Sequence, residues 1–193
     1  MGKKRIFLGI RPNKKNLEQL IEMQKTLQTY GLFYRHKRDC RWTREHNLHL
    51  TMHFIGSAEQ SQIDSLQRRL PDIRMHVRHE QTLDHIRMLP GTTWARVGAL
   101  GGQVANVQLL AVWNHLALLL QNLNIEVEKR PFYPHMTLLR FRKPVRFEKT
   151  ELEMLTLQCL QFSVESVCLY ESILGREGSR YEIIEDFPLA LLG

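Results

Sequence analysis

Cysteine is scarce in this chain of 193 residues, and the three that occur are Cys40, Cys159 and Cys168. They form no CxxC pair, and their number is odd. A disulfide framework normally has an even number of cysteines, and a structural zinc site uses closely spaced pairs. We therefore expect buried thiols in a reducing compartment. The apolar run at the N-terminus is also too short for a signal peptide, so we expect a cytoplasmic protein.

Acidic residues are in deficit. The chain has 20 Asp and Glu against 27 Lys and Arg, which gives a formal net charge of +7. A positive field of this size attracts polyanions, nucleic acid first and anionic membranes second. Many basic proteins bind no nucleic acid, so charge alone leaves the ligand open.

Charged residues are absent from one long segment, between Val97 and Ile125. Its apolar residues from Leu109 to Leu123 recur at spacings of three, four and seven, and its amides fall on the opposite side. Several amides in one membrane span would be costly in lipid. The segment therefore predicts a long helix that covers a core, and no membrane anchor.

The rest of the chain alternates between strand and helix patterns. We predict a strand at 5–10, a helix over 14–30 ended by Gly31, a basic connection over 35–47, and a helix from a Ser57–Gln60 capping box to Leu70. Two strands joined by Pro90-Gly91, the long helix, a strand after Pro134 and a hairpin with Gly175 and Gly178 in its loop follow. This order predicts an α+β fold, antiparallel sheets backed by helices, in a single domain over 1–193.

One four-residue pattern occurs twice. It reads His49-Leu50-Thr51-Met52 in "NLHLTMHFIG" and His135-Met136-Thr137-Leu138 in "YPHMTLLRF". With nine histidines in the chain, two H-x-T triplets are unremarkable by number. In a strand, however, alternate side chains point to opposite faces, so each His and Thr would share one face while the apolar pair faces the core. Two such strands side by side would bring two imidazoles and two hydroxyls to one site.

This set of groups suits acid–base chemistry at a phosphorus centre. One imidazole could take a proton from water and the other could protonate the leaving oxygen, each contributing about 10²- to 10⁴-fold in rate. Threonine hydroxyls could donate to the non-bridging oxygens. Arg140 offers forked donors suited to phosphate. Its offset of five from His135 places it on the opposite strand face unless the strand ends or bulges near Leu139.

Two other interpretations of these histidines were considered. A strand threonine is common and a lone histidine is usually an ordinary surface or core residue, so the motifs could be structural. His49 and His53 are spaced as an i, i+4 pair, but in a strand they would lie roughly 13 Å apart, too far to share a metal ion. The segment also lacks the glutamate of H-E-x-x-H. We therefore expect no metal site and no cofactor.

The two motifs and their flanks resemble the two-histidine (2H) phosphoesterase superfamily, and more narrowly the bacterial RNA 2′,3′-cyclic phosphodiesterases, also called 2′-5′ RNA ligases. The similarity runs nearly end to end, through "RIFLGI", "RWTREHNLHLTMHFIG", "RPFYPHMTLLR" and "LYESILGREGSRYEII". It implies two pseudo-symmetric lobes, each an antiparallel sheet backed by helices. The lobes would face a central cleft that carries the two H-x-T-x motifs.

The resemblance also implies a reaction, the opening of an RNA-terminal 2′,3′-cyclic phosphate by water to leave a 2′-phosphate, without a metal. His49 would be the proton donor to the departing 3′ oxygen and His135 the proton acceptor from water, a polarity that the sequence itself leaves open. The phosphate oxygens would be held by Thr51, Thr137 and Arg140. Phe7, Trp42, Phe132 and Tyr133 could each stack on a nucleobase, or could be core residues.

The expected partners are RNA ends or nucleoside 2′,3′-cyclic phosphates, and we expect a monomer that binds no membrane. Two alternatives stay open. The same site could run the reverse step and join a cyclic-phosphate end to a 5′-hydroxyl, as a 2′-5′ RNA ligase. The fold could also serve as an RNA- or nucleotide-binding module without turnover, which the presence of both histidines and both threonines disfavours.

Overall fold

The computed structural model describes residues 2–155, 157–175 and 178–191. Its strands are β1 (Lys4–Ile10), β2 (Cys40–Trp42), β3 (Leu50–Ala58), β4 (His79–Leu83), β5 (His85–Leu89), β6 (Ala95–Gly101), β7 (His135–Val145), β8 (Leu160–Val164), β9 (Ser166–Gly175) and β10 (Gly178–Pro188). Its helices are α1 (Lys14–Thr29), α2 (Gly31–Tyr34), α3 (Gln60–Arg69), α4 (Val107–Asn122) and α5 (Lys149–Glu153), with 3-10 turns η1 (Glu45–Asn47), η2 (Leu70–Met75) and η3 (Thr92–Trp94).

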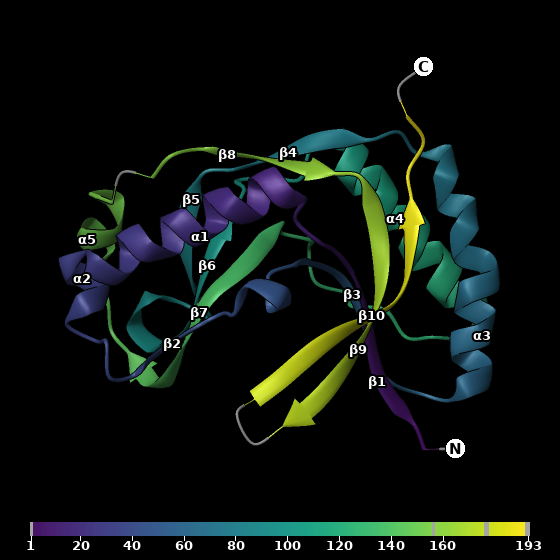
Figure 1. Cartoon of the computed structure of the whole chain (residues 1–193), viewed down its shortest axis with the longest axis horizontal. Coiled ribbons are helices and arrows are strands. Elements are labelled where there is room, and N and C mark those ends of the chain that lie inside the picture. Colours follow the sequence, from purple (N-terminus) through teal and green to yellow (C-terminus); the bar gives the residue numbers. More distant parts are fainter. Residues whose placement is uncertain (1, 156, 176–177, 192–193) are drawn as a thin grey trace.

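The main sheet has the strand order β10-β9-β1-β3-β7-β6-β5, with β2 added beside β7, and β4 and β8 form a separate pair. All pairings between these strands are antiparallel. The two motif strands, β3 and β7, are neighbours at the centre, and the far end of the β9–β10 hairpin projects at the lower centre of Figure 1. The predicted α+β fold with antiparallel sheets is confirmed. The turn of the predicted hairpin, 176–177, lies outside the described residues.

Two helix boundaries differ from the sequence prediction. The Asn13 side chain accepts the backbone N–H of Asn16 at 2.9 Å and starts α1, as a cap should. Gly31 does not simply stop this helix, because it opens the short helix α2. The cap of α3 is Glu59 and not Ser57. Ser57 is still paired with β1, so the strand extends past the predicted helix start.

The charge-free segment divides into two elements. Its first residues belong to β6, and Asn106 caps α4 by accepting the backbone N–H of Leu109 at 2.7 Å. The predicted apolar face is buried at Leu109, Val112, Leu116, Leu119 and Leu120. Within the described residues, no helix combines the length and the apolar character that crossing a membrane requires.

One hydrophobic cluster runs through both halves of the chain and includes the apolar residues of both motifs, Leu50, Met52, Met136 and Leu138. These four are buried as predicted. Each long helix packs on a motif strand from the other half of the chain: α1 packs on β7 and α4 packs on β3. Each motif strand is therefore backed by a helix from the other half of the chain.

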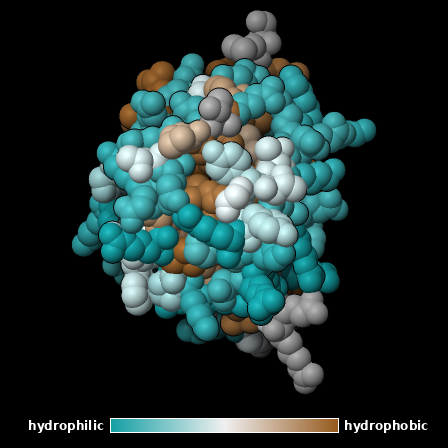
Figure 2. Space-filling view, turned by 90° about the vertical axis from the view of Figure 1, so that its left-hand side faces the viewer, coloured by the Kyte–Doolittle hydropathy of each residue, from teal (hydrophilic) through white to brown (hydrophobic). Residues whose placement is uncertain are grey.

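The connection predicted over 35–47 contains more structure than its basic sequence suggested. Its residues Cys40–Trp42 form β2, which pairs with β7. Nearby, the guanidinium of Arg35 donates to both carboxylate oxygens of Glu151, at 2.7 and 2.8 Å, and joins the α2 end to α5. Hydrophilic side chains dominate the surface at this end of the molecule (Figure 2).

The expectation of buried thiols holds for one cysteine only. Cys168 is buried, Cys40 is half-buried and Cys159 is exposed, and all three are free. Burial raises the pKa of Cys40 to about 11, so this thiol stays protonated at neutral pH.

Candidate active site

The polar residues of the two motifs meet in one cleft of about 720 Å³. β3 and β7 pair at Leu50 and Met136. In an antiparallel pair this register places each histidine beside the threonine of the other motif, on one face. The two imidazoles then belong to diagonal neighbours, roughly 7–8 Å apart at the backbone. The cleft is lined by all four predicted residues, His49, Thr51, His135 and Thr137.

Both imidazoles are held in the same way. Nδ1 of His49 lies 2.7 Å from the carbonyl oxygen of Asn47, and Nδ1 of His135 lies 2.9 Å from that of Tyr133. A carbonyl oxygen only accepts hydrogen bonds, so the proton of each neutral ring is on Nδ1. This tautomer leaves Nε2 of each ring to take or give a proton in the cleft.

His49 is packed among aromatic rings. Its ring centroid lies 4.8 Å from that of Phe7 and 4.9 Å from that of Tyr181. Burial, together with the positive charges of Arg140 and His135, lowers the pKa of His49 to about 4 against the raising effect of the Asn47 carbonyl. His49 is therefore neutral at pH 7 in the free protein.

Arg140 reaches the cleft because β7 is bulged. The register between β6 and β7 passes from Leu139 to Thr137 and skips Leu138, which makes Leu138 the extra residue of a β-bulge. Leu138 and Leu139 are consequently both buried, and the alternation resumes one residue later. Arg140 thus shares the cleft face with Thr137, and the bulge that the sequence required near Leu139 is present.

β3 has the same irregularity at the matching place. Its register with β1 skips Met52, so Met52 and His53 are both buried. His53 turns away from the cleft and stacks on Trp113 at 4.9 Å, which separates it from His49. Phe54 turns into the cleft and is 64% exposed. Strict alternation does not place Phe54 in the cleft. The sequence offered one signal for it: Phe54 follows His49 by five residues, as Arg140 follows His135.

A helix supports each bulge through a side-chain hydrogen bond, which is buried at Leu138 and partly buried at Met52. The indole N–H of Trp113 in α4 donates to the Met52 carbonyl at 3.1 Å. The amide of Gln24 in α1 donates to the Leu138 carbonyl at 2.9 Å, and Gln24 is only 7% exposed. A bulge frees carbonyls from the strand ladder, and buried carbonyls need a donor. These two side chains thus hold the backbone that aims the cleft residues.

This geometry agrees with the comparisons to known proteins. The family model described as "LigT like Phosphoesterase" matches residues 10–97, which contain the first motif. Over these residues the chain is similar to this phosphoesterase family. A curated RNA 2′,3′-cyclic phosphodiesterase of Aeropyrum pernix is 26% identical over 160 residues, 77% of this chain and 86% of that protein. The one of Methanocaldococcus jannaschii is 23% identical over 189 residues, 95% of this chain and 99% of its own. The crystal structure of E. coli LigT in apo form superposes with a TM-score of 0.78, at 23% identity over 98% of this chain and 99% of that one.

Phe7 supports the first histidine. Phe7 is 3% exposed, and its ring stacks on Tyr170 at 4.7 Å while it contacts His49. The predicted stacking of Phe7 on a base would need an open ring face, which this packing does not leave. Phe7 therefore contributes by fixing the imidazole of His49.

The other predicted aromatic residues are dispersed. Trp42 lines the cleft. Tyr133 does not line it: its ring lies under the guanidinium of Arg87, 4.9 Å from the centroid, and its contribution is the carbonyl that holds His135. Phe132 stacks on Trp113, away from the lining. Of these three rings, only that of Trp42 lines the cleft.

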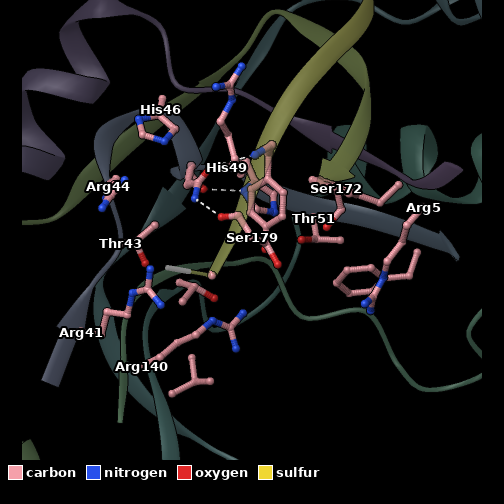
Figure 3. A pocket seen from close by; sticks show the side chains of 18 of the residues that line it. Arg5, Arg41, Thr43, Arg44, His46, His49, Thr51, Arg140, Ser172 and Ser179 are labelled. Carbon is pink, nitrogen blue, oxygen red and sulfur yellow. Dashed lines mark hydrogen bonds between the residues drawn. The ribbon is translucent and has the colours of Figure 1, made fainter. Parts of the chain in front are cut away.

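The β9–β10 hairpin forms one wall of the cleft and is tied to the first motif. The Asn47 side chain donates to the Ser179 carbonyl at 2.8 Å and accepts the backbone N–H of Tyr181 at 3.0 Å. The carbonyl of the same Asn47 holds His49. Figure 3 labels His49 together with Ser172 and Ser179 of the hairpin, which line the same cleft. One residue thus joins the hairpin to the support of an imidazole, a role that no local sequence signal indicated.

The cleft is strongly basic. Five arginines line it, Arg5, Arg41, Arg44, Arg140 and Arg180, and its described lining includes no Asp or Glu. Two of them belong to the basic connection predicted over 35–47. Such a lining favours anionic ligands. In the described part of the chain, no group of three or more His, Cys, Asp or Glu side chains could hold a metal ion.

Proposed function

We propose that this protein hydrolyses RNA-terminal 2′,3′-cyclic phosphates to 2′-phosphates, with two histidines as general acid and base and without a metal ion. The observation that carries the proposal is the convergence of His49 and His135, each with Nδ1 on a carbonyl, in one arginine-lined cleft. The names of the curated relatives, RNA 2′,3′-cyclic phosphodiesterases, support the same substrate.

The proposed step moves two protons. Nε2 of His135 takes a proton from water as the water oxygen bonds to phosphorus. His49 gives its Nε2 proton to the 3′ oxygen as the bond from phosphorus to that oxygen breaks, leaving a 3′-hydroxyl and a 2′-phosphate. Thr51 and Thr137 donate to the non-bridging oxygens, and Arg140 stabilises the charge that develops on them.

A proton donor must be protonated when it acts, whereas His49 of the free protein has its pKa lowered to about 4. The causes are burial and two neighbouring positive charges. A cyclic phosphate bound between the rings brings a negative charge, which favours the imidazolium form. We therefore propose that His49 gains its proton together with the substrate.

The test is hydrolysis of an RNA oligonucleotide with a 2′,3′-cyclic end in the presence of EDTA. Wild type should form the 2′-phosphate, and His49→Ala and His135→Ala should each lower kcat/KM by about 10²-fold or more. His115→Ala is the matched control, because His115 pairs with His76 at 2.9 Å and is not a cleft residue. Wild-type rates in either motif variant, with the fold intact by circular dichroism, would refute the proposal. An added 5′-hydroxyl strand shows whether any product is ligated.

We further propose that residues 1–193 act as one bilobal domain and as a monomer in the cytoplasm. The four motif residues and Arg140 line one cleft within a single chain, which is consistent with a monomer. Light scattering after size-exclusion chromatography, at the protein concentration of the assay, tests the monomer.

A further inference from the structure

Two arginines of the cleft are direct cross-strand neighbours. In the register of β2 and β7, Arg41 pairs with Arg140. Residues opposite each other in an antiparallel pair lie about 5 Å apart, and like charges at such positions destabilise the sheet. Both side chains line the cleft, and Figure 3 shows them on one side of it, with Arg5 on the other.

Neither charge is neutralised within the described protein. No described Asp or Glu forms an ion pair with Arg41 or Arg140, although other exposed arginines do have one, such as Arg11 with Asp186 at 2.5 Å. Two adjacent guanidinium groups with no carboxylate partner among the described residues favour the binding of anions. The fold tolerates this repulsion at the cleft, which points to ligands that carry more than one negative charge.

The two guanidinium groups occupy different parts of the cleft. Arg140 lies near the histidines, since its charge acts on His49. Arg41 lies against the first residue of β10: a Cβ built at Gly178 would be 2.6 Å from its Nη1 and 2.8 Å from its Nη2. Gly178 has φ +105 and no side chain, so the guanidinium of Arg41 occupies the space that a Cβ would otherwise fill. Arg41 is therefore held beside the hairpin, whereas Arg140 lies near the reacting group.

We propose that Arg41 binds the phosphodiester immediately 5′ of the terminal cyclic phosphate, so that the enzyme prefers oligonucleotide ends to mononucleotides. This inference rests on the proposed function. A cyclic phosphate carries one negative charge, which Arg140 and the motif residues can neutralise. The next negative charge along an RNA strand is the adjacent phosphodiester, and guanidinium donors suit its oxygens.

Three substrates separate the effect of that charge from other effects of length. They are a nucleoside 2′,3′-cyclic phosphate, a dinucleotide with the same cyclic end, and this dinucleotide with an uncharged methylphosphonate linkage. In wild type we expect kcat/KM for the charged dinucleotide to exceed that of the other two by about tenfold, the size of one charge-assisted hydrogen bond. In Arg41→Gln this ratio should fall close to one. Arg74→Gln, an exposed arginine outside the cleft, should keep the wild-type ratio.

Two outcomes of this assay would overturn the inference. If Arg41→Gln lowers all substrates by one factor, Arg41 only supports the hairpin or shares the reacting phosphate with Arg140. If wild type does not distinguish the methylphosphonate, the adjacent phosphodiester is not bound. If wild type hydrolyses none of the substrates, the proposed function fails, and Arg41 is then tested by binding alone. Arg41→Gln should bind the dinucleotide with a terminal 2′-phosphate more weakly than wild type does, and equal affinity would overturn the inference. Thermal unfolding adds a check, because relief of the arginine repulsion should leave Arg41→Gln at least as stable as wild type.

Discussion

Acidification should destabilise this protein through His49, and a His49 variant separates this contribution from that of the other titrating groups. The imidazole is packed between Phe7 and Tyr181, and its pKa is lowered to about 4 by burial first and by neighbouring positive charge second. In the unfolded chain the same group has a pKa near 6.5. Between these values the unfolded chain binds a proton at His49 that the folded protein does not bind.

The sign and size of the effect follow from linkage. Stability rises with pH wherever the unfolded state binds more protons, so the contribution of neutral His49 is complete above pH 6.5 and is lost as the pH falls towards 4. Between pH 7.5 and pH 4.5 the two pKa values give a loss of at most about 2.5 kcal/mol in the free energy of unfolding. His49→Gln cannot titrate, so it should lose less stability over this range by that amount.

Urea unfolding of wild type and His49→Gln at pH 7.5 and pH 4.5 measures this difference. Other groups that titrate, including the buried His53, are common to both proteins and cancel in the comparison. The reasoning is refuted if the two proteins lose the same stability on acidification. A smaller loss in wild type than in the variant would show that His49 is stabilised as imidazolium in the free protein.

Two further predictions concern the bulged strands. Gln24→Leu removes the donor to the Leu138 carbonyl, and we expect a loss of about 1–3 kcal/mol in stability together with a lower kcat/KM, because the bulge aims Arg140. The control is Gln28→Leu, which replaces an exposed glutamine of the same helix. An unchanged kcat/KM in Gln24→Leu would show that the bulge holds without the bond. Phe54→Ala should weaken binding of RNA ends by about 1–3 kcal/mol if the exposed ring stacks on a base, whereas Phe54→Trp should bind as wild type. Fluorescence anisotropy with a labelled 2′-phosphate oligonucleotide measures both Phe54 variants, and equal affinity in all three proteins would contradict stacking.

The motif residues could be predicted from sequence because strand alternation is a local property. His49 with Thr51, and His135 with Thr137, needed only a period of two to share a face. Their neighbouring apolar residues identified which face is buried. The family resemblance supplied the shared cleft, but it implied one motif strand in the sheet of each lobe. That β3 and β7 are neighbours in one sheet was not predicted, since pairing between distant segments leaves no local pattern.

The residues at the offset of five could not be placed in the same way. Whether Arg140 and Phe54 enter the cleft depends on bulges at Leu138 and Met52, and a bulge is fixed by the partner strand and by donors from the helices behind it. Strand alternation therefore placed Arg140 in the cleft only if the strand was bulged, and it placed Phe54 on the wrong face. The same dependence on partners explains β2, whose basic sequence forms a strand only beside β7.

The most direct test of the account is whether one phosphate contacts both imidazoles. Protein with ¹⁵N-labelled histidines can be titrated with adenosine 2′-phosphate, the product of the proposed reaction on the mononucleotide, while the Nε2 signals are followed by NMR. The account predicts that His49 and His135 shift together along one saturation curve, with His49 moving towards imidazolium. A ligand that shifts one ring alone, or separate curves for the two rings, would contradict it.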